Sequence, residues 1–356
     1  MHATDLPPVG PEVALTIIVK ALNEEGGIAA CLRSALAELD GLDGEVVLAD
    51  SLSTDRTVEI AAEFQVRIVQ FESSADRSCG AALQLGYQFA RGHLIYVLDG
   101  DMTMEPGFLR AAIAYLAAHP DVAGVGGRLL DRHVHTMADR LRVVQYEGLR
   151  EECDVRVLGG GGLYRRSAIE AVGYLSNRWL PAFEEAELGV RLAAAGWRLV
   201  RLAQPAVSHS GHRESSSQML MRLWRNGRIE ASGTFLRAAL GHSWLGRSVK
   251  LCWFVFAAPA LYCAALLAAA FGAGAGAAFF PTFAALAVAL WALVFGVLAW
   301  RKKSLAEAAL ALASWHLYAL GAARGFLRPA GDPRLAIPAR EQPPGAAPND
   351  RVVESI

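Results

Sequence analysis

Two aspartates separated by one glycine, Asp99 and Asp101, form the sharpest chemical signal in the sequence. They directly follow the apolar run 94–98, which has the length and composition of a buried strand. Two carboxylates at a strand end can hold a hard cation such as Mg²⁺ or Mn²⁺, with nucleotide phosphates filling the other positions. Such an ion would neutralise the charge that builds on a leaving diphosphate. A plain Asp-Gly turn at the end of a strand is the alternative, and both interpretations stay open.

Asp50 follows another apolar run, 46–49, in a comparable position. A carboxylate there can accept a hydrogen bond from the imide N–H of a uracil ring, and Ser53 can cap the next turn. The alternative is that Asp50 and Ser53 only cap a helix that begins near Thr57. The residue types do not decide between base binding and capping.

Three acidic residues, Glu184, Glu185 and Glu187, lie at the expected start of a helix that extends to about Ala195. A carboxylate at that position is stabilised by the helix dipole and suits a general base beside a hydroxyl acceptor. Acidic residues without any catalytic role are also common in the first turn of helices. Both interpretations therefore remain.

Weaker signals accompany these motifs. Asn23 and Glu24 follow the first apolar run and could contact a ligand or simply form a turn. His209 lies in a polar stretch that we expect to be a loop, where its imidazole could complete a metal shell or be solvated. The glycine run 159–162 could contact phosphate, but it lacks the GxGxxG spacing that indicates a dinucleotide site.

Five β-rich runs, separated by helical patterns, must position these residues. The runs are 15–19, 45–49, 66–71, 94–98 and 122–125. Strands separated by helices indicate βαβ units, so we expect an α/β fold with a mainly parallel sheet. In such sheets ligands bind beyond the carboxyl ends of the strands, which is where the polar motifs fall.

The composition divides the chain into a charged part and an apolar part. Hydrophobic residues make up 53% of the chain, yet 251–300 contain no Asp, Glu, Lys or Arg. The net charge of −1 gives no electrostatic reason to expect a nucleic-acid partner. The five scattered cysteines and the absence of a signal-peptide core favour reduced thiols in a cytosolic compartment.

The charge-free run is long enough for two membrane crossings, since one crossing needs about 20 residues. We expect helices at 251–272 and 278–300, joined through a glycine-rich break. Both flanks are basic, so both ends should face the cytoplasm. The segment 304–327 contains Glu307, His316 and Arg324 and could either cross the membrane or lie in its interface.

These patterns predict how the chain is organised, with membrane lipid as a partner. The expected segments are a disordered N-terminus at 1–12, a soluble domain at 13–232, an amphipathic juxtamembrane linker at 233–250, a membrane region at 251–327 and a disordered, Pro- and Gly-rich tail at 328–356.

The motifs also follow a particular order. The blocks are 16–19, 23–25, 50–55, Arg77 with 80–86, 99–101, 162–166, 184–188, His209 and 222–228. This succession resembles family 2 glycosyltransferases of the Rossmann-like GT-A fold over roughly residues 13–230. The hairpin after it is similar to that of many bacterial members. The resemblance implies a multi-pass protein of the cell inner membrane with a cytoplasmic catalytic domain.

The family implies a metal-dependent, inverting transfer of a sugar from a nucleotide-sugar donor. The donor-binding residues that it implies are Asn23, Glu24, Asp50, Ser53, Arg77, Asp99, Arg222 and Arg225. Asp101, together with Asp99 and His209, would hold Mg²⁺ or Mn²⁺ beside the diphosphate. Glu185 would be the base that deprotonates the acceptor hydroxyl, with Glu184 as the alternative.

Three residues depart from the family pattern. Lys20 stands where many members have proline, and Leu52 replaces the usual glycine of its block. Glu185 replaces the more common aspartate and makes the base one methylene longer, which matters because reactive geometry tolerates little displacement.

We expect a nucleotide-diphosphate sugar as donor, a UDP-sugar in the first place, and a hydroxyl of a lipid-linked or cell-surface saccharide as acceptor. An alternative acceptor is polyprenyl phosphate, although an ionised phosphate needs no base such as Glu185. Another alternative is a non-catalytic membrane scaffold, against which the intact acidic motifs speak. A dinucleotide-dependent oxidoreductase is excluded because no glycine fingerprint follows the first strand.

Overall fold

The computed structural model describes residues 13–134, 137–209, 214–274, 276–329 and 331–342. The chain divides into two compact units. One, called here the α/β unit, comprises 1–216 and 331–356, and the other, called the helical unit, comprises 217–330. The expected disordered segment 1–12 lies outside the described residues.

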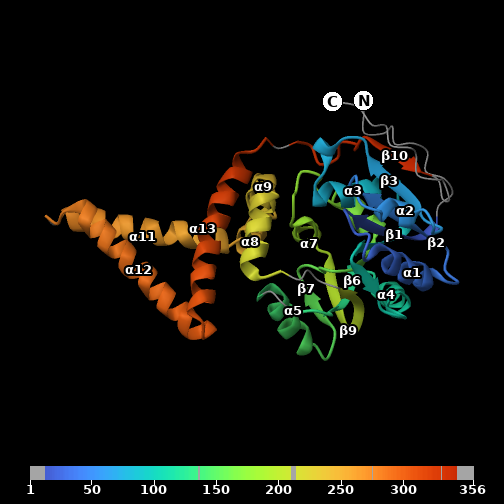
Figure 1. Ribbon diagram of the computed structural model, residues 1–356, viewed down its shortest axis with the longest axis horizontal. Coiled ribbons are helices and arrows are strands. Elements are labelled where there is room, and N and C mark those ends of the chain that lie inside the picture. The colour runs from blue at the N-terminus through green and yellow to red at the C-terminus, as the bar shows by residue number, and fades with distance from the viewer. Residues whose placement is uncertain (1–12, 135–136, 210–213, 275, 330, 343–356) are drawn as a thin grey trace. The chain divides into compact units, whose positions relative to one another are not determined.

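The α/β unit is built on one mixed sheet (Figure 1). Its strands are β1 (Val13–Ala21), β2 (Gly44–Asp50), β3 (Arg67–Phe71), β4 (Gly92–Asp99), β5 (Met102–Met104), β6 (Val122–Asp131), β7 (Cys153–Val155), β8 (Gly162–Arg165), β9 (Arg198–His209) and β10 (Ala339–Gln342). They lie in the order β10-β3-β2-β1-β4-β8-β6-β9-β5, with β7 paired to β9. Strands β3, β2, β1 and β4 are parallel neighbours, as the apolar runs predict.

Helices cover both faces of this sheet (Figure 1). They are α1 (Ile28–Leu39), α2 (Thr57–Ala61), α3 (Cys79–Phe89), α4 (Phe108–Ala118), α5 (Met137–Glu147), α6 (Arg166–Ala171) and α7 (Glu184–Ala194). Successive side chains of a strand point to opposite faces. Ile17 therefore packs in one cluster with residues of α1 and α4, whereas Ile18 packs in another with residues of α3, α6 and α7. Burial on both faces explains why β1 reads as a continuous apolar run.

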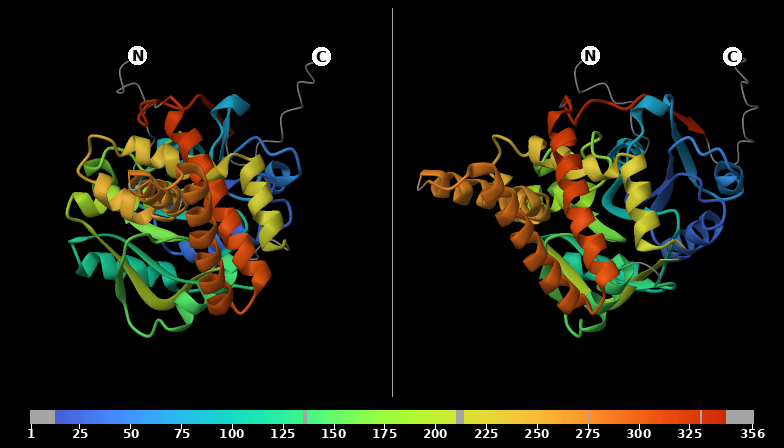
Figure 2. Two further views of the ribbon diagram at one scale, coloured as in Figure 1. Left: turned by 90° about the vertical axis from the view of Figure 1, so that its left-hand side faces the viewer. Right: turned by 60° about the vertical axis from the view of Figure 1, so that its left-hand side comes forward.

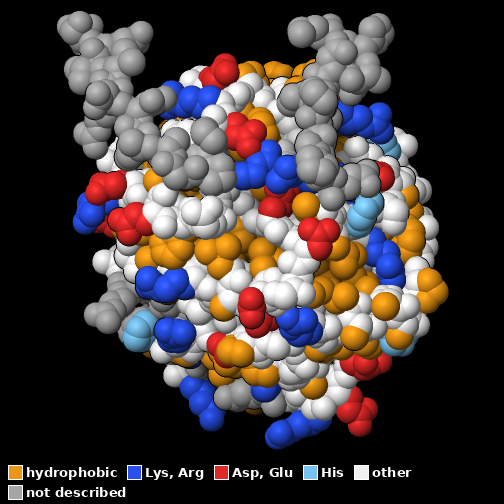
Figure 3. All heavy atoms as spheres, turned by 90° about the vertical axis from the view of Figure 1, so that its right-hand side faces the viewer, with side chains coloured by type: hydrophobic (Ala, Val, Ile, Leu, Met, Phe, Trp, Pro, Cys, Tyr) orange, Lys and Arg blue, Asp and Glu red, His pale blue; other side chains and the backbone are white. Residues whose placement is uncertain are grey.

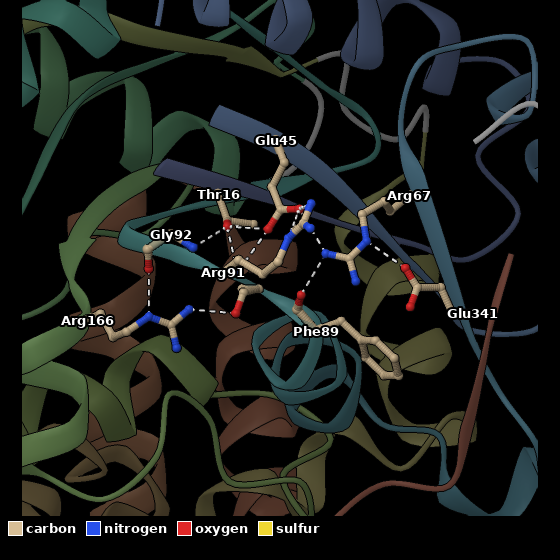
Figure 4. A network of polar contacts seen from close by, with 9 residues as sticks. Thr16, Glu45, Arg67, Phe89, Arg91, Gly92, Arg166 and Glu341 are labelled. Atoms are coloured by element: carbon tan, nitrogen blue, oxygen red, sulfur yellow. Dashed lines mark hydrogen bonds and ion pairs between the residues drawn. The ribbon is translucent and has the colours of Figure 1, made fainter. Parts of the chain in front are cut away.

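A buried charge network joins the amino-terminal ends of the central strands (Figure 4). The Glu45 carboxylate accepts hydrogen bonds from Thr16, from the Arg91 backbone and side chain, and from Arg67. Its side chain is 8% exposed. Arg67 also pairs with Glu341 of β10, 2.6 Å away. The network fixes the sheet at the edge opposite the carboxyl ends of the parallel strands.

The expected disordered tail at 328–356 is wrong for residues 331–342. β10 pairs antiparallel with β3, and Ile337 before it is 1% exposed. The Ile337 backbone exchanges two hydrogen bonds with the Gln88 side chain, and Arg178 donates to the Leu335 and Ala336 carbonyls. The composition did not predict this ordered segment, because it is held by backbone pairing and by one buried side chain, and neither produces an apolar pattern in the sequence.

The helical unit consists of α8 (Ser216–Arg225), the short 3₁₀ helix η2 (Arg228–Glu230), α9 (Ala231–Ala238), α10 (Leu245–Leu251), α11 (Phe254–Gly274), α12 (Phe279–Lys302) and α13 (Leu305–Leu327). Among the described residues, α11 and α12 are long and apolar enough to cross a membrane, with mean hydropathies of 2.1 and 2.3. They form the two arms of a hairpin (Figure 2). The expected helices at 251–272 and 278–300 lie within three residues of these bounds, and their crossing of a membrane stays a prediction.

The first helices of this unit pack against α13, which corrects the expected domain boundary at 232. Glu230 is 4% exposed and pairs with Arg324 and Arg328. A Cβ on Gly233 would lie 1.8 Å from the Ala322 carbonyl oxygen, so the two backbones touch. Residues 217–232 therefore fold with the helical unit. Whether 304–327 crosses a membrane stays a prediction, as does the juxtamembrane role of 233–250.

The surface of the α/β unit carries mixed charge. On the face shown in Figure 3, Lys and Arg side chains are interspersed with Asp and Glu among apolar side chains. That distribution matches the near-zero net charge of the chain.

Candidate active site

The carboxyl ends of β1, β2 and β4 meet at one edge of the sheet and bring the predicted acidic residues together. The strand register pairs Ala21 with Asp50 and Lys20 with Asp99. Asp50 and Asp99 therefore flank the end of β1. A Cβ on Gly100 would lie 3.2 Å from the side chains of Ala21 and Glu24, so the glycine lets the loop after β4 approach the loop after β1.

The loops after β1 and β2 are hydrogen-bonded to each other. The Asn23 backbone donates to Ser53 Oγ at 2.9 Å, and Asn23 Oδ1 accepts from the Thr54 backbone at 2.8 Å. Asp50 is fully buried and accepts from Ser53 and from Gln70. Asp50 and Ser53 thus shape the loop, and their contact with a nucleotide base stays a prediction.

Glu24 faces the remaining acids of this edge. Its backbone N–H donates to Thr57 Oγ1 at 2.7 Å, which anchors it over the β2 loop. Burial, followed by the charges of Asp101, Asp99 and Asp55, raises the pKa of Glu24 to about 7. The site therefore concentrates negative charge when no cation is present.

Leu52, one of the departures from the family pattern, has a φ of 60°. This left-handed conformation is favourable for glycine and costs other residues roughly 1–2 kcal/mol. The turn after β2 thus has the backbone geometry that explains a glycine in other members. This chain accommodates leucine there, with the side chain packed beside residues of β2, β3 and α3.

His209 is the last residue of β9, not part of a loop as expected, and lies between two carboxylates. Its Nε2 is 3.0 Å from Asp101 Oδ2, and its Nδ1 is 3.0 Å from Asp131 Oδ1. Carboxylates only accept, so both ring nitrogens donate. The hydrogen bond to Asp101 raises the pKa of His209 to about 9. The rest of the expected loop, 210–213, lies outside the described residues.

Asp101 and His209 fit a divalent cation that has further ligands from a substrate. The part of the chain that the structure describes holds no cluster of three His, Cys, Asp or Glu side chains arranged for a metal ion. Mg²⁺ and Mn²⁺ prefer oxygen ligands, and Mg²⁺ commonly binds one or two carboxylates together with substrate phosphates and water. His209 would be the one nitrogen ligand of such a set. Two protein ligands at one point of the site are compatible with that pattern.

Lys20 is a site residue that sequence reasoning noticed only as a departure. Its ammonium lies 3.1 Å from Asp99 Oδ1 and 2.6 Å from Glu184 Oε1. Burial alone would lower the pKa of Lys20, but Asp99 and Glu184 raise it well above its usual value, so the ammonium stays charged. One signal in the sequence indicates this role, which is that Lys20 lies at the carboxyl end of a strand, where the donor is expected to bind.

Glu185 lies in the first turn of α7, beside the glycine run. Phe183, which caps the helix, has a φ of 70°, and Gly159, Gly160 and Gly161 also have positive φ values. This backbone lets the Gly160 N–H bond to the Glu185 carboxylate. Burial raises the pKa of Glu185 to about 7, and Glu184 and Asp99 add to it, while Lys20 opposes the rise.

The remaining predicted residues are placed as follows. Glu187 is fully buried and accepts hydrogen bonds from Arg191 and Tyr174, which is a structural role. Arg77 donates to the Ser51 carbonyl at 3.1 Å, at the end of β2. Arg222 and Arg225 lie in the last turn of α8 in the helical unit, and their contact with phosphate stays a prediction.

Asp131 was not predicted. It ends β6, and its side chain is 1% exposed and holds both His209 and Arg142. The apolar run that predicted this strand ended at Val125, six residues before it.

The loops that carry this site lie in a region of the chain that matches a known protein family. Residues 16–171 match the profile of the family described as glycosyl transferase family 2. The chain carries a family 2 glycosyltransferase domain. The matched region contains β1 to β8 and therefore the loops that hold Asp50, Asp99 and Asp101.

Two curated relatives of this glycosyltransferase domain act in glycan biosynthesis. The low-salt glycan biosynthesis hexosyltransferase Agl6 of Haloferax volcanii is 40% identical over 93 residues, which cover 26% of this chain and 22% of the relative. The succinoglycan biosynthesis protein ExoO of Rhizobium meliloti is 35% identical over 136 residues, which cover 35% of this chain and 38% of the relative. The chain thus matches well under half the length of these relatives.

A solved structure shares the fold. The mannosyltransferase PcManGT from Pyrobaculum calidifontis, in complex with GDP-Man and Mn²⁺, is 20% identical with a TM-score of 0.57. The likeness covers 89% of this chain and 88% of that one. The glycosyltransferase domain therefore has a GT-A-like α/β fold, and the C-terminal region adds two apolar helices that could span a membrane.

Proposed function

We propose that this chain is a metal-dependent, inverting glycosyltransferase that moves a sugar from a nucleotide-diphosphate sugar to an acceptor hydroxyl. The observation that carries the proposal is the convergence of three groups in the α/β unit. The Asp101–His209 pair lies at the start of β5 and the end of β9, and the Asn23–Ser53 loops lie beside it. Glu185 interacts with the charges of Lys20 and Asp99.

Asp101 and His209 would hold Mg²⁺ or Mn²⁺. The ion supplies Lewis-acid stabilisation of the leaving nucleoside diphosphate when bound. The 3.0 Å separation of Asp101 Oδ2 and His209 Nε2 supports this assignment because the two atoms are close enough for one cation to replace the proton that they share. The Mn²⁺ in the PcManGT complex supports it at the level of the fold.

Glu185 would act as the base that removes the proton from the acceptor hydroxyl. A pKa near 7 suits a base that works at neutral pH, because it is ionised yet still basic. Glu184 is the weaker candidate, since its carboxylate is paired with Lys20 at 2.6 Å. An acceptor hydroxyl needs such a base, whereas polyprenyl phosphate does not, so the hydroxyl acceptor is the preferred assignment.

The loops after β1 and β2 would hold the nucleotide of the donor. Asn23, Glu24, Asp50 and Ser53 lie there, and Asp99 lies next to them at the end of β4. We favour a UDP-sugar because a buried carboxylate such as Asp50 matches the imide N–H of uracil. GDP also presents N–H donors on its base, so the GDP-Man of PcManGT makes guanine the competing assignment.

The acceptor would be a lipid-linked or cell-surface saccharide at a membrane. Glycan and succinoglycan biosynthesis by the relatives supports a saccharide acceptor. Helices α11 and α12 would cross the cell inner membrane and leave the catalytic domain in the cytoplasm, since basic residues flank both ends of the pair.

The test is nucleotide release by the purified full chain from UDP-, GDP- and TDP-sugars with Mn²⁺ or Mg²⁺. We expect metal-dependent release from one donor class and its loss in Asp101→Ala. Asp121→Ala is the matched control, because Asp121 precedes β6 at the opposite end of the sheet and pairs only on the surface with Arg198. No release from any donor by the wild type, or unchanged release by Asp101→Ala, would support the scaffold and overturn the proposal.

A further inference from the structure

The sheet register places a second carboxylate against His209. β6 and β9 are parallel neighbours, and Asp131 is the Cα partner of His209 at the carboxyl end of both strands. β5 pairs with β9 on its other side, where Met102, the residue after Asp101, is the partner of His209. The imidazole is therefore flanked by Asp131 from one strand and by Asp101 from the other.

Side-chain and backbone hydrogen bonds fix Asp131 in this position. Its side chain is 1% exposed, and Oδ1 accepts from His209 Nδ1 at 3.0 Å. Arg142 of α5 grips the same carboxylate with two nitrogens, each 3.0 Å from an oxygen. The Arg132 backbone N–H donates to the His209 carbonyl at 3.0 Å, so the two strand ends are tied as well.

We propose that Asp131 is a positioning residue that orients the His209 ring, so that Nε2 faces the cation held beside Asp101. The inference rests on the proposed function, because it needs the Asp101–His209 cation site. Ring nitrogens that bind metals usually have their partner N–H fixed by a carboxylate or carbonyl, which sets both tautomer and ring orientation. Here Asp131 binds Nδ1–H, so Nε2, which faces Asp101, is the nitrogen that would bind the cation once its proton is lost. The bidentate Arg142 contact restricts the carboxylate to one geometry.

The test is a Mn²⁺ titration of the full chain in detergent, with and without UDP, in which free Mn²⁺ is followed by electron paramagnetic resonance. Losing a partner of this kind typically weakens metal binding about 10- to 100-fold, so we expect Asp131→Asn to weaken Mn²⁺ binding by at least about tenfold. His209→Ala should weaken it too. Asp139→Asn is the matched control, because Asp139 pairs with the same Arg142 at 2.5 Å yet is not a Cα partner of His209. It should bind Mn²⁺ as the wild type does.

A second variant covers the case in which Asp131→Asn does not fold. Arg142→Lys keeps the positive charge but loses the two-pronged contact with Asp131, so it should also weaken Mn²⁺ binding while the unfolding midpoint without metal stays near that of Asp139→Asn. Wild-type affinity in both Asp131→Asn and Arg142→Lys would overturn the inference and leave the proposed function intact. A wild-type chain that binds no Mn²⁺, with or without UDP, would instead refute the metal site of the proposed function.

Discussion

The sharpest consequence of the site concerns the pH dependence of Glu185. Burial raises the pKa of its carboxyl to about 7, and the base must be deprotonated to act, so the rate should rise with pH. With that pKa the ionised fraction grows from about 0.1 at pH 6 to about 0.9 at pH 8, which predicts a roughly tenfold faster turnover at the higher pH. Lys20 holds the pKa of Glu185 down, so Lys20→Met should move the midpoint to higher pH.

Glu185→Gln removes the base but keeps its shape. General-base catalysis usually contributes about 10²- to 10⁴-fold, so the variant should lose about that much turnover and its remaining rate should no longer rise between pH 6 and pH 8. The assay is nucleotide release at saturating donor and metal, measured in steps across that range. Donor binding, measured separately with UDP, should change little because Glu185 is not among the residues assigned to the nucleotide.

Glu184→Gln is the matched control, one residue away on the same helix turn. It should lose the ion pair with Lys20 and some activity, but keep the pH-dependent rise. If Glu184→Gln flattens the profile and Glu185→Gln does not, the two roles are reversed. If both variants keep the wild-type profile, neither carboxyl is the base and the reasoning from burial and charge fails.

Two predictions concern the stability of the α/β unit. Glu45→Gln leaves Arg91, which is partly buried, without its charge partner and leaves Arg67 with Glu341 alone, so it should cost about 3 kcal/mol in urea unfolding. Glu59→Gln, at an exposed pair, should change nothing measurable. Burial alone would raise the pKa of Glu45, but the hydrogen bonds from Arg91 and Arg67 lower it below the ordinary carboxyl value. The ionised Glu45 therefore stabilises the fold above the ordinary carboxyl pKa, and this stabilisation is lost as the pH falls through the lowered pKa. Ile337→Ala should cost about 3 kcal/mol and speed hydrogen exchange of the β3 amides; unchanged β3 exchange would contradict a stabilising role for β10.

The parallel half of the sheet was predictable because each strand is buried on both faces over most of its length and is therefore mainly apolar. In the rest of the sheet only the start of β6 was predicted, because the other strands are short or contain polar residues. β9 contains Arg201, Gln204 and Pro205 and has no clear alternation, and β10 is made of Ala, Arg, Glu and Gln. Such strands form because a neighbouring edge offers unpaired backbone groups, and that information does not lie in their own residues.

The same distinction applies to the site. Asp50, Asp99, Asp101 and Glu185 were found from their places after apolar runs or at a helix start, and the structure brings them to one unit. Lys20 and Asp131 gave no comparable signal, because their roles depend on which strands lie side by side. Lys20 meets Asp99 through the β1–β4 register, and Asp131 meets His209 through the β6–β9 register.

After the helical unit the chain re-enters the α/β unit as β10, which pairs with β3. In the sequence, the helical unit is therefore inserted between two parts of the α/β unit. A fragment that stops after β9 would lack the strand that covers β3 and the partner of Arg67, leaving an open sheet edge that invites association with other chains. A water-soluble version of the enzyme should therefore join residue 216 to residue 331 through a flexible linker and keep the sequence through Gln342.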